Sequence, residues 1–378
     1  MPRFTRSRTL PALAAGLIAV AVPATATAAV AGGASGHENE FRQTNLISNR
    51  TDQGAQVVDP NLQNPWGLAM GPATPLWVAD NNSGTATVYS INVGGTTVAK
   101  VPLTVTLPGG RVSTGDGPSP TGQVFNPTDD FVVKSKAGKG PALFIFSAEA
   151  GQISAWSPKA DPITAGASTA QVEFSSKTAV YKGLAIASAE GHTYLYASNF
   201  HDGTVDVFNS KFHKVHLEGN FQDPGIPMGF APFGIQAIRG FIYVTYAKQN
   251  AARHDDVAGP GNGFIDIYTR EGFLVKRLVS HGDLNSPWGL ALAPDGFGAF
   301  SGRLLVGNFG DGLTHAYNAF SGKPGGALLN EQGQPIQIDD LWGLRFGTNT
   351  TGGEHTLLFS AGINDEKDGL VGSINHVR

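Results

Sequence analysis

A short phrase recurs through most of the chain: an aromatic residue, then Gly, an apolar residue, and Ala or Gln. Close copies begin at Trp66, Lys182, Phe233, Trp288 and Trp342. A degenerate copy lies at 128–131, with Asp129 at the glycine position. The spacing defines six units of roughly 55 residues each, a period typical of repeat architectures.

Each unit contains further short apolar runs separated by Gly-bearing turns. In the first unit, Leu76 begins the second run and Gly84 precedes a third run that alternates apolar and polar residues. A fourth, more polar run follows in several units, and no helical periodicity intervenes. Four short strands repeated six times predict an all-β fold, a six-bladed β-propeller with blades beginning near residues 65, 127, 181, 232, 287 and 341.

The two ends of the repeat predict how the ring closes. The last unit stops after its third strand, at 372–374, and the segment 41–48 precedes the first unit without a unit of its own. We therefore expect 41–48 to supply the fourth strand of the last blade, which leaves no open sheet edge. The propeller domain is predicted to span 41–378.

The first 28 residues have the features of a secretory signal peptide. A basic start with Arg3, Arg6 and Arg8 precedes an Ala-rich apolar stretch and an A-x-A pattern ending at Ala28. The alternative is an uncleaved anchor, but the stretch is short for a membrane span. We expect cleavage on the Sec route, a flexible linker at 29–40, no membrane span in the mature chain and an extracellular location.

Charge and cysteine content exclude several classes of partner and site. The chain has 26 Lys and Arg against 30 Asp and Glu, and loss of the signal removes only basic residues. An acidic surface argues against nucleic acid or anionic lipid as partner. The chain has no cysteine, so disulfides, Cys-zinc sites and thiol catalysis are excluded.

Propeller topology predicts that one rim of the channel collects aromatic and polar residues. The start of each first strand shares this rim with the turn after each second strand. The predicted binding residues there are Trp66, Asp80, Asn199, Phe233, Trp288, Asn308 and Trp342. Convergence of such groups on a concavity favours a ligand site. The alternative is that the Asx residues bond their own hairpins and the aromatic residues wedge between blades.

Three long loops are expected at the same rim, at 108–126, 248–262 and 361–369. Loops on a rigid scaffold often carry binding residues, although solvated insertions remain an equal alternative. His254, in the second loop, is a candidate acid–base group or simply a polar surface residue.

Carboxylates and Asn side chains near this rim suggest a cation site. Asp80, Asp129, Asn199 and Asn308 are the candidate ligands, and oxygen donors of this kind suit Ca²⁺. No EF-hand spacing is present, and solvated acids are the alternative reading. No zinc-protease, nucleophile-elbow or Walker motif occurs.

The repeats resemble those of NHL-repeat and SMP-30/gluconolactonase-like six-bladed propellers. A closer resemblance, over 41–378, is to a family of uncharacterised exported bacterial propellers, some of which carry a PEP-CTERM sorting tail. The phrases that carry it begin at Asn64, Thr121, Ala231, Leu284, Leu305 and Leu341. The lactonase-like resemblance implies a metal held by an early Glu, two Asn and an Asp. Asn199 and Asn308 are partial counterparts, but no Glu lies between Glu40 and Glu149.

Three functions remain open from the sequence. The first is a secreted, monomeric binding scaffold that takes a small molecule, glycan or protein at the loop-rich rim. The second is a metal-dependent hydrolase of the lactonase type. The third is a quinone-dependent sugar oxidoreductase, for which only Arg253 and His254 are candidate rim residues.

Overall fold

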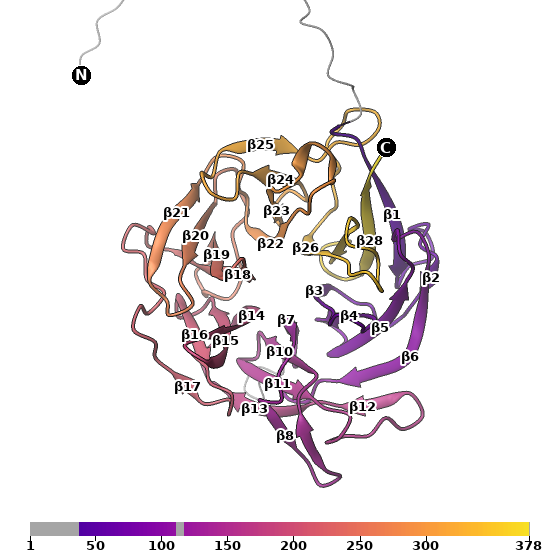
Figure 1. Ribbon diagram of the computed structural model, residues 1–378, viewed down its shortest axis with the longest axis vertical. Helices are drawn as coiled ribbons and strands as arrows, with labels where there is room; N and C mark the ends of the chain where they lie inside the picture. The colour runs from indigo at the N-terminus through magenta and orange to yellow at the C-terminus, as the bar shows by residue number, and fades with distance from the viewer. Residues whose placement is uncertain (1–37, 111–116, 378) are drawn as a thin grey trace, which may run out of the picture. The chain divides into compact units, whose positions relative to one another are not determined.

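The computed structural model describes residues 38–110 and 117–377, and within them the chain forms a ring of six blades (Figure 1). The six-bladed all-β propeller predicted from the repeat is confirmed. The predicted signal peptide and most of the predicted linker lie outside the described residues. Among the described residues, no helix is both long and apolar enough to cross a membrane.

Each blade is an antiparallel sheet whose first strand lies nearest the channel. The first blade contains β3 (Pro65–Ala69), β4 (Leu76–Asp80), β5 (Thr85–Ile91) and β6 (Val98–Thr106). The second contains β7 (Pro120–Phe125), β10 (Phe144–Ala148), β11 (Gln152–Trp156) and β13 (Gln171–Ser175). The third contains β14 (Tyr181–Ala189), β15 (His192–Asn199), β16 (Thr204–Phe208) and β17 (Lys214–Val215).

The remaining blades follow the same order. The fourth contains β18 (Phe230–Ile238), β19 (Phe241–Lys248), β20 (Gly263–Tyr268) and β21 (Leu274–Ser280). The fifth contains β22 (Pro287–Leu292), β23 (Leu304–Asn308), β24 (Thr314–Tyr317) and β25 (Pro324–Ala327). The sixth contains β26 (Leu341–Phe346), β27 (Leu357–Ala361), β28 (Leu370–His376) and β1 (Phe41–Ser48).

Four short elements lie outside this plan. β2 (Val57–Val58) pairs in parallel with β1, and β8 (Val132–Lys134) forms a hairpin with β9 (Lys139–Pro141). β12 (Ala167–Thr169), from the second blade's segment, pairs in parallel with β6 of the first blade. The one helical element of the described residues is a short 3₁₀ turn at Gly298–Phe300.

The second blade begins earlier than the sequence predicted. Its first strand is β7, so the prediction of a start near residue 127 is wrong, and part of the predicted loop 108–126 is strand. Gly122 occupies the repeat's glycine position instead of Asp129. A Cβ at Gly122 would overlap the backbone nitrogen of Leu184 in the next blade. The Thr121-Gly-Gln phrase lacks the aromatic residue that marks the other copies, so the repeat pattern did not identify it.

The repeated glycine is required where neighbouring first strands approach each other. A Cβ at Gly67 would lie 2.5 Å from the carbonyl oxygen of Thr121, and one at Gly289 would lie 2.5 Å from that of Trp342. One at Gly343 would lie 2.6 Å from the carbonyl oxygen of Trp66, across the closure of the ring. Any other residue would push the inner strands apart.

The ring closes as predicted, by pairing of the two ends of the chain. β1 pairs antiparallel with β28, from Phe41 opposite His376 to Ser48 opposite Leu370. Phe41 is fully buried, with ring centroids 4.9 Å from Phe297 and 5.8 Å from Phe300. The β1 strand thus contributes both backbone hydrogen bonds and a core side chain to the last blade.

The hydrophobic core lies between the blades. In the described residues, six clusters of buried apolar side chains each join one pair of neighbouring blades. A seventh cluster differs, because it gathers residues from several blades at the channel. That cluster is the structural basis of the candidate site.

Candidate functional site

Aromatic side chains from four first strands, and from the turns after two second strands, meet in the channel. They form an aromatic layer of six residues: Trp66, Phe200, Phe233, Trp288, Phe309 and Trp342. Trp66 stacks on Trp342 with centroids 3.4 Å apart, and Phe309 stacks on Trp342 from the other side at 4.1 Å. Trp288 meets Trp66 edge-on at 6.0 Å. Such geometries are favourable for aromatic pairs.

The side chains of the aromatic layer are closely packed. Trp66 is 2% exposed and Trp342 is 1% exposed, while Phe233 is fully buried. The indole nitrogen of Trp288 donates to the carbonyl oxygen of Lys182 at 2.8 Å, a bond that joins the fifth blade to the third.

Lys182 is the charged member of the repeat position that elsewhere carries mostly aromatic residues. Its side chain is 3% exposed, and its ammonium lies 5.2 Å from the ring centroid of Trp66. The ammonium forms an ion pair with Glu149 and lies 3.5 Å from a carboxylate oxygen of Asp255. A buried lysine needs such partners, because an isolated charge in the interior is costly.

The electrostatics of Lys182 follow from these contacts. Burial lowers the pKa of Lys182, but the carboxylates of Glu149, Asp255 and Asp256 raise it by more, so the pKa lies above its ordinary value. Lys182 is therefore a fixed cation at neutral pH. Its charge also lies near the faces of Trp66 and Phe200, where cation–π attraction adds to the ion pairs.

The loop between β19 and β20 brings His254 and Asp255 to the same place. Nδ1 of His254 lies 2.7 Å from Oδ1 of Asp255. This hydrogen bond lowers the pKa of Asp255 to about 2 and raises that of His254. Ligand atoms of Glu149, His254 and Asp255 all lie within 4.8 Å of one another.

The sixth blade contributes a further carboxylate, Glu366, from the loop between β27 and β28. Asn64 donates from Nδ2 to Glu366 at 2.9 Å and accepts the indole N–H of Trp342 at 3.1 Å, which ties this loop to the aromatic layer. Burial raises the pKa of Glu366 to about 7. Burial also raises the pKa of Asp340 and of Asp256.

We call the carboxylates that interact with Lys182, or with one another beside it, at this end of the channel the acidic mouth. It consists of Glu149, Asp255, Asp256, Asp340 and Glu366. Each comes from a loop at the start of a first strand or the end of a second strand, as the topology requires. The mouth contains more acids than cations.

Several predicted site residues lie at this site. Trp66, Phe233, Trp288 and Trp342 come together in the aromatic layer, and His254 lies at the acidic mouth. The aromatic residues do not wedge singly between blades but contact one another across the channel.

Asp80, Asn199 and Asn308 lie at the expected end of their strands but bond within their own blades. The register places them opposite Pro65, Tyr181 and Pro287 respectively. All three are fully buried. Asp80 accepts from the Thr85 hydroxyl at 3.2 Å.

The two Asn side chains have similar local partners. Asn199 donates to Asp202 at 2.8 Å, and Asn308 donates to the carbonyl oxygen of Asp283 at 2.7 Å. Asp129 follows the end of β7, so it lies at the opposite end of a first strand from Asp80 and is exposed. The structure thus does not bring the four candidate metal ligands together.

Sequence reasoning missed Glu149, Lys182 and Glu366. Lys182 carried a usable signal, because it is a charged residue at a repeat position where Trp or Phe is usual. Glu149 and Glu366 lie in loops whose residues do not align between units. Their convergence depends on the ring.

Comparisons with known proteins show two kinds of likeness. No known family model matches the chain. Two uncharacterised proteins of Acanthamoeba polyphaga mimivirus are similar in sequence: R648, 32% identical over 87% of this chain and 78% of its own length, and L690, 31% identical over 87% and 84%. These relatives are viral, so membership of an exported bacterial family stays a prediction.

Solved structures share the fold at low sequence identity. Virginiamycin B lyase from Staphylococcus aureus, in a catalytically inactive form with quinupristin, has a TM-score of 0.51 at 12% identity, covering 89% of this chain and 99% of that chain. An alpha-L-arabinanase from Penicillium chrysogenum with arabinobiose also has 0.51 at 12% identity, covering 88% and 97%. The likeness to these structures concerns the propeller fold alone. By sequence, the chain belongs to the protein family that includes the mimivirus proteins R648 and L690.

Proposed function

We propose that this protein is a secreted binding propeller that takes a small neutral or cationic molecule at the acidic mouth. The observation that carries the proposal is the buried Lys182–Glu149 ion pair with Asp255 beside it, next to the aromatic layer. A preformed set of polar groups beside aromatic side chains is a common form of small-molecule site.

The charge of the mouth selects the class of ligand. Five carboxylates share the mouth with Lys182 and His254, and Lys182 is already paired. Ionised carboxylates accept hydrogen bonds, so hydroxyl and ammonium groups are suitable partners, whereas an anionic ligand is repelled. Asp255, whose side chain is 60% exposed, is the carboxylate most available to a ligand.

Binding is tested by calorimetry on the purified protein with three sets of probes: neutral oligosaccharides, polyamines and uronic acids. We expect binding from the first or second set and none from the third. Asp255→Asn should weaken binding at least fivefold, and Glu354→Asn, a change at an exposed acid remote from the mouth, should leave it unchanged. Binding confined to uronic acids, or equal affinity of both variants, contradicts the proposal.

A second candidate function is a metal-dependent hydrolase, and one observation favours it. Glu149, His254 and Asp255 offer a nitrogen and oxygens within 4.8 Å, a donor set that suits Zn²⁺ better than the all-oxygen preference of Ca²⁺. Lys182 argues against a metal at this position, because its ammonium already contacts the carboxylates of Glu149 and Asp255. A metal would have to share or displace this cation.

Metal content separates the two candidates. We expect the purified protein to contain no stoichiometric divalent ion and its melting temperature to be unaffected by Zn²⁺, Ca²⁺ or EDTA. A stoichiometric metal together with hydrolysis of lactones would instead establish the hydrolase. Lys182→Gln sharpens the test, since removal of the competing ammonium should raise Zn²⁺ affinity only if the three donors can form a metal site.

A further inference from the structure

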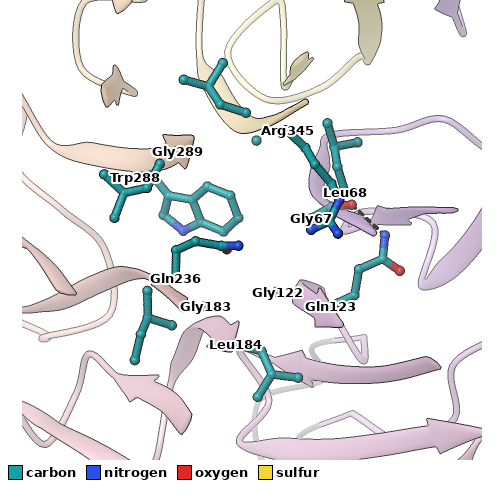
Figure 2. A pocket seen from close by; sticks show the side chains of 14 residues that line it. Gly67, Leu68, Gly122, Gln123, Gly183, Leu184, Gln236, Trp288, Gly289 and Arg345 are labelled. Carbon is teal, nitrogen blue, oxygen red and sulfur yellow. Dashed lines mark hydrogen bonds between the residues drawn. The ribbon is translucent and has the colours of Figure 1, made fainter. Parts of the chain in front are cut away.

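The channel contains a second polar space below the aromatic layer. It is a small cavity of about 40 Å³ whose roof includes Trp288. Its wall is formed by the repeated glycines and the residues that follow them, including Gly67, Gly122, Gly183 and Gly289 (Figure 2). A volume of this size holds one or a few water-sized groups.

Arg345, on β26, brings a positive charge to this cavity. None of the other residues that line the cavity is charged. Its Nη2 donates to the carbonyl oxygen of Met70 at 3.2 Å. Within residues 38–110 and 117–377, no ion pair involves Arg345, in contrast to Lys182 on the other side of the aromatic layer. Arginine stays charged under all ordinary conditions, so this charge lacks a protein counterion.

The electrostatic environment of Arg345 also indicates that its charge has no carboxylate partner. Burial lowers the pKa of Arg345, and no neighbouring carboxylate raises it again. Arg345 is half-buried, and a charge that is partly removed from water is stabilised by a partner of opposite charge. The guanidinium has five N–H donors, which leaves several available to a ligand beyond the bond to Met70.

Two glutamines make the cavity polar as well as charged. In Figure 2 the side chains of Gln236 and Arg345 extend from different walls toward the middle of the cavity. Gln123, another lining residue, is 5% exposed, and its Oε1 accepts no hydrogen bond within the described part of the chain. Gln123 is held against the first blade, because its Nε2 donates to the carbonyl oxygens of Gly67 and Trp77.

We infer that this cavity is a binding site for a small monovalent anion, of the size of a halide or formate, held by the guanidinium of Arg345. The anion supplies the missing counter-charge and accepts charge-assisted N–H bonds. A volume of about 40 Å³ favours small ions over larger oxyanions such as phosphate. Because the aromatic layer lies between this site and the acidic mouth, the inference does not depend on the proposed function.

The test measures melting temperature at constant ionic strength, with gluconate, which is too large for the cavity, replaced stepwise by chloride, bromide, formate or phosphate. We expect a saturable rise of about 2 °C or more with the small anions and none with phosphate. Arg345→Met should abolish the rise. Arg239→Met, which removes an exposed arginine, should behave as the unaltered protein.

A second measurement covers the possibility that Arg345→Met fails to fold. Crystals of the unaltered protein grown in bromide should show an anomalous peak within hydrogen-bond distance of the Arg345 guanidinium. The inference is overturned by the absence of that peak, by a rise that Arg345→Met retains, or by stabilisation with phosphate alone.

Discussion

The indole rings of Trp66 and Trp342 stack with their centroids 3.4 Å apart, and this contact joins the first innermost strand of the ring to the last. A hydrogen bond also joins the last blade to the first, because the Ser360 hydroxyl on β27 donates to the carbonyl oxygen of Trp66 on β3 at 2.5 Å. Gly343 makes this approach possible. Ring closure and the sealing of the channel therefore depend on one set of residues.

The close approach of inner strands predicts a large effect at Gly234. A Cβ there would overlap the carbonyl oxygen of Trp288 in the next blade. Gly234→Ala should lower the free energy of unfolding by about 3 kcal/mol, because the first strands of two blades must separate. Urea denaturation measures this. Gly117→Ala is the matched control, since a Cβ at Gly117 meets nothing within 4 Å; an equal effect of both changes would refute the argument.

The closing strand should be essential for stability. Phe41→Ala removes a fully buried ring that contacts Phe297 and Phe300, and we expect a loss of about 3–5 kcal/mol in the free energy of unfolding. Phe320→Ala, at an 82% exposed position, should have little effect. Deletion of residues 41–48 should lower stability further, as it removes one of the two partner strands of β28. A truncated protein that melts like the full chain contradicts this account.

Lys182 should stabilise the fold through its ion pair. Lys182→Met leaves Glu149 and Asp255 without their cation and should cost about 3 kcal/mol at neutral pH, measured by chemical denaturation. The double change Lys182→Met with Glu149→Gln should recover part of this loss.

Lys367 offers the control for Lys182. Its ion pair with Asp365 is exposed, so Lys367→Met should change stability by less than about 0.5 kcal/mol. If both lysine variants had the same stability, or if the double variant were no more stable than Lys182→Met, the ion pair would not have the role assigned to it.

The raised pKa of Glu366 predicts how the stability of the fold depends on pH. Burial raises its pKa in the folded protein to about 7 from an ordinary value of 4.5. Its contribution to stability is therefore fully present below pH 4.5 and is lost as the pH rises through 7, where ionisation of the buried carboxyl disfavours folding.

Replacement of Glu366 by Gln should remove this loss. We expect Glu366→Gln to match the unaltered protein near pH 4.5 and to exceed it by about 1–3 kcal/mol at pH 8. In this variant the new side chain still has a carbonyl oxygen that can accept the hydrogen bond from Asn64. Thermal melts between these pH values measure the difference, and Glu354→Gln, at an exposed site, should show none. A gap that is constant with pH would contradict the assignment.

Much of the fold could be predicted from the sequence because the repeat is local and regular. The glycine period located five of six first strands, and the missing fourth strand of the last unit located β1. The second blade was placed late because Thr121 replaces the aromatic residue that marks the other copies, while Asp129 imitated their spacing. The aromatic residue is the most recognisable feature of each copy in the sequence, whereas the close packing of the inner strands requires only the glycine.

The candidate site was predicted less well. The sequence identified the Trp and Phe residues that form the aromatic layer, since the repeat places them at one level of the channel. It assigned Asp80, Asn199 and Asn308 to the same rim, and their strand positions agree, yet their side chains bond inside their own blades. Strand register determines the end of a blade at which a residue lies, but local hydrogen-bond partners determine where its side chain points.

The sequence alone determined the number of blades, the closure of the ring and the glycines at its centre, because these depend on spacing along the chain. Only the tertiary structure decided that Lys182 pairs with Glu149 from the second blade and Asp255 from the fourth, and that Arg345 has no such partner. The physical reason is that charges act through distance in space. The ring brings loops and strands from separate blades together at the channel. No pattern in the sequence relates these segments to one another.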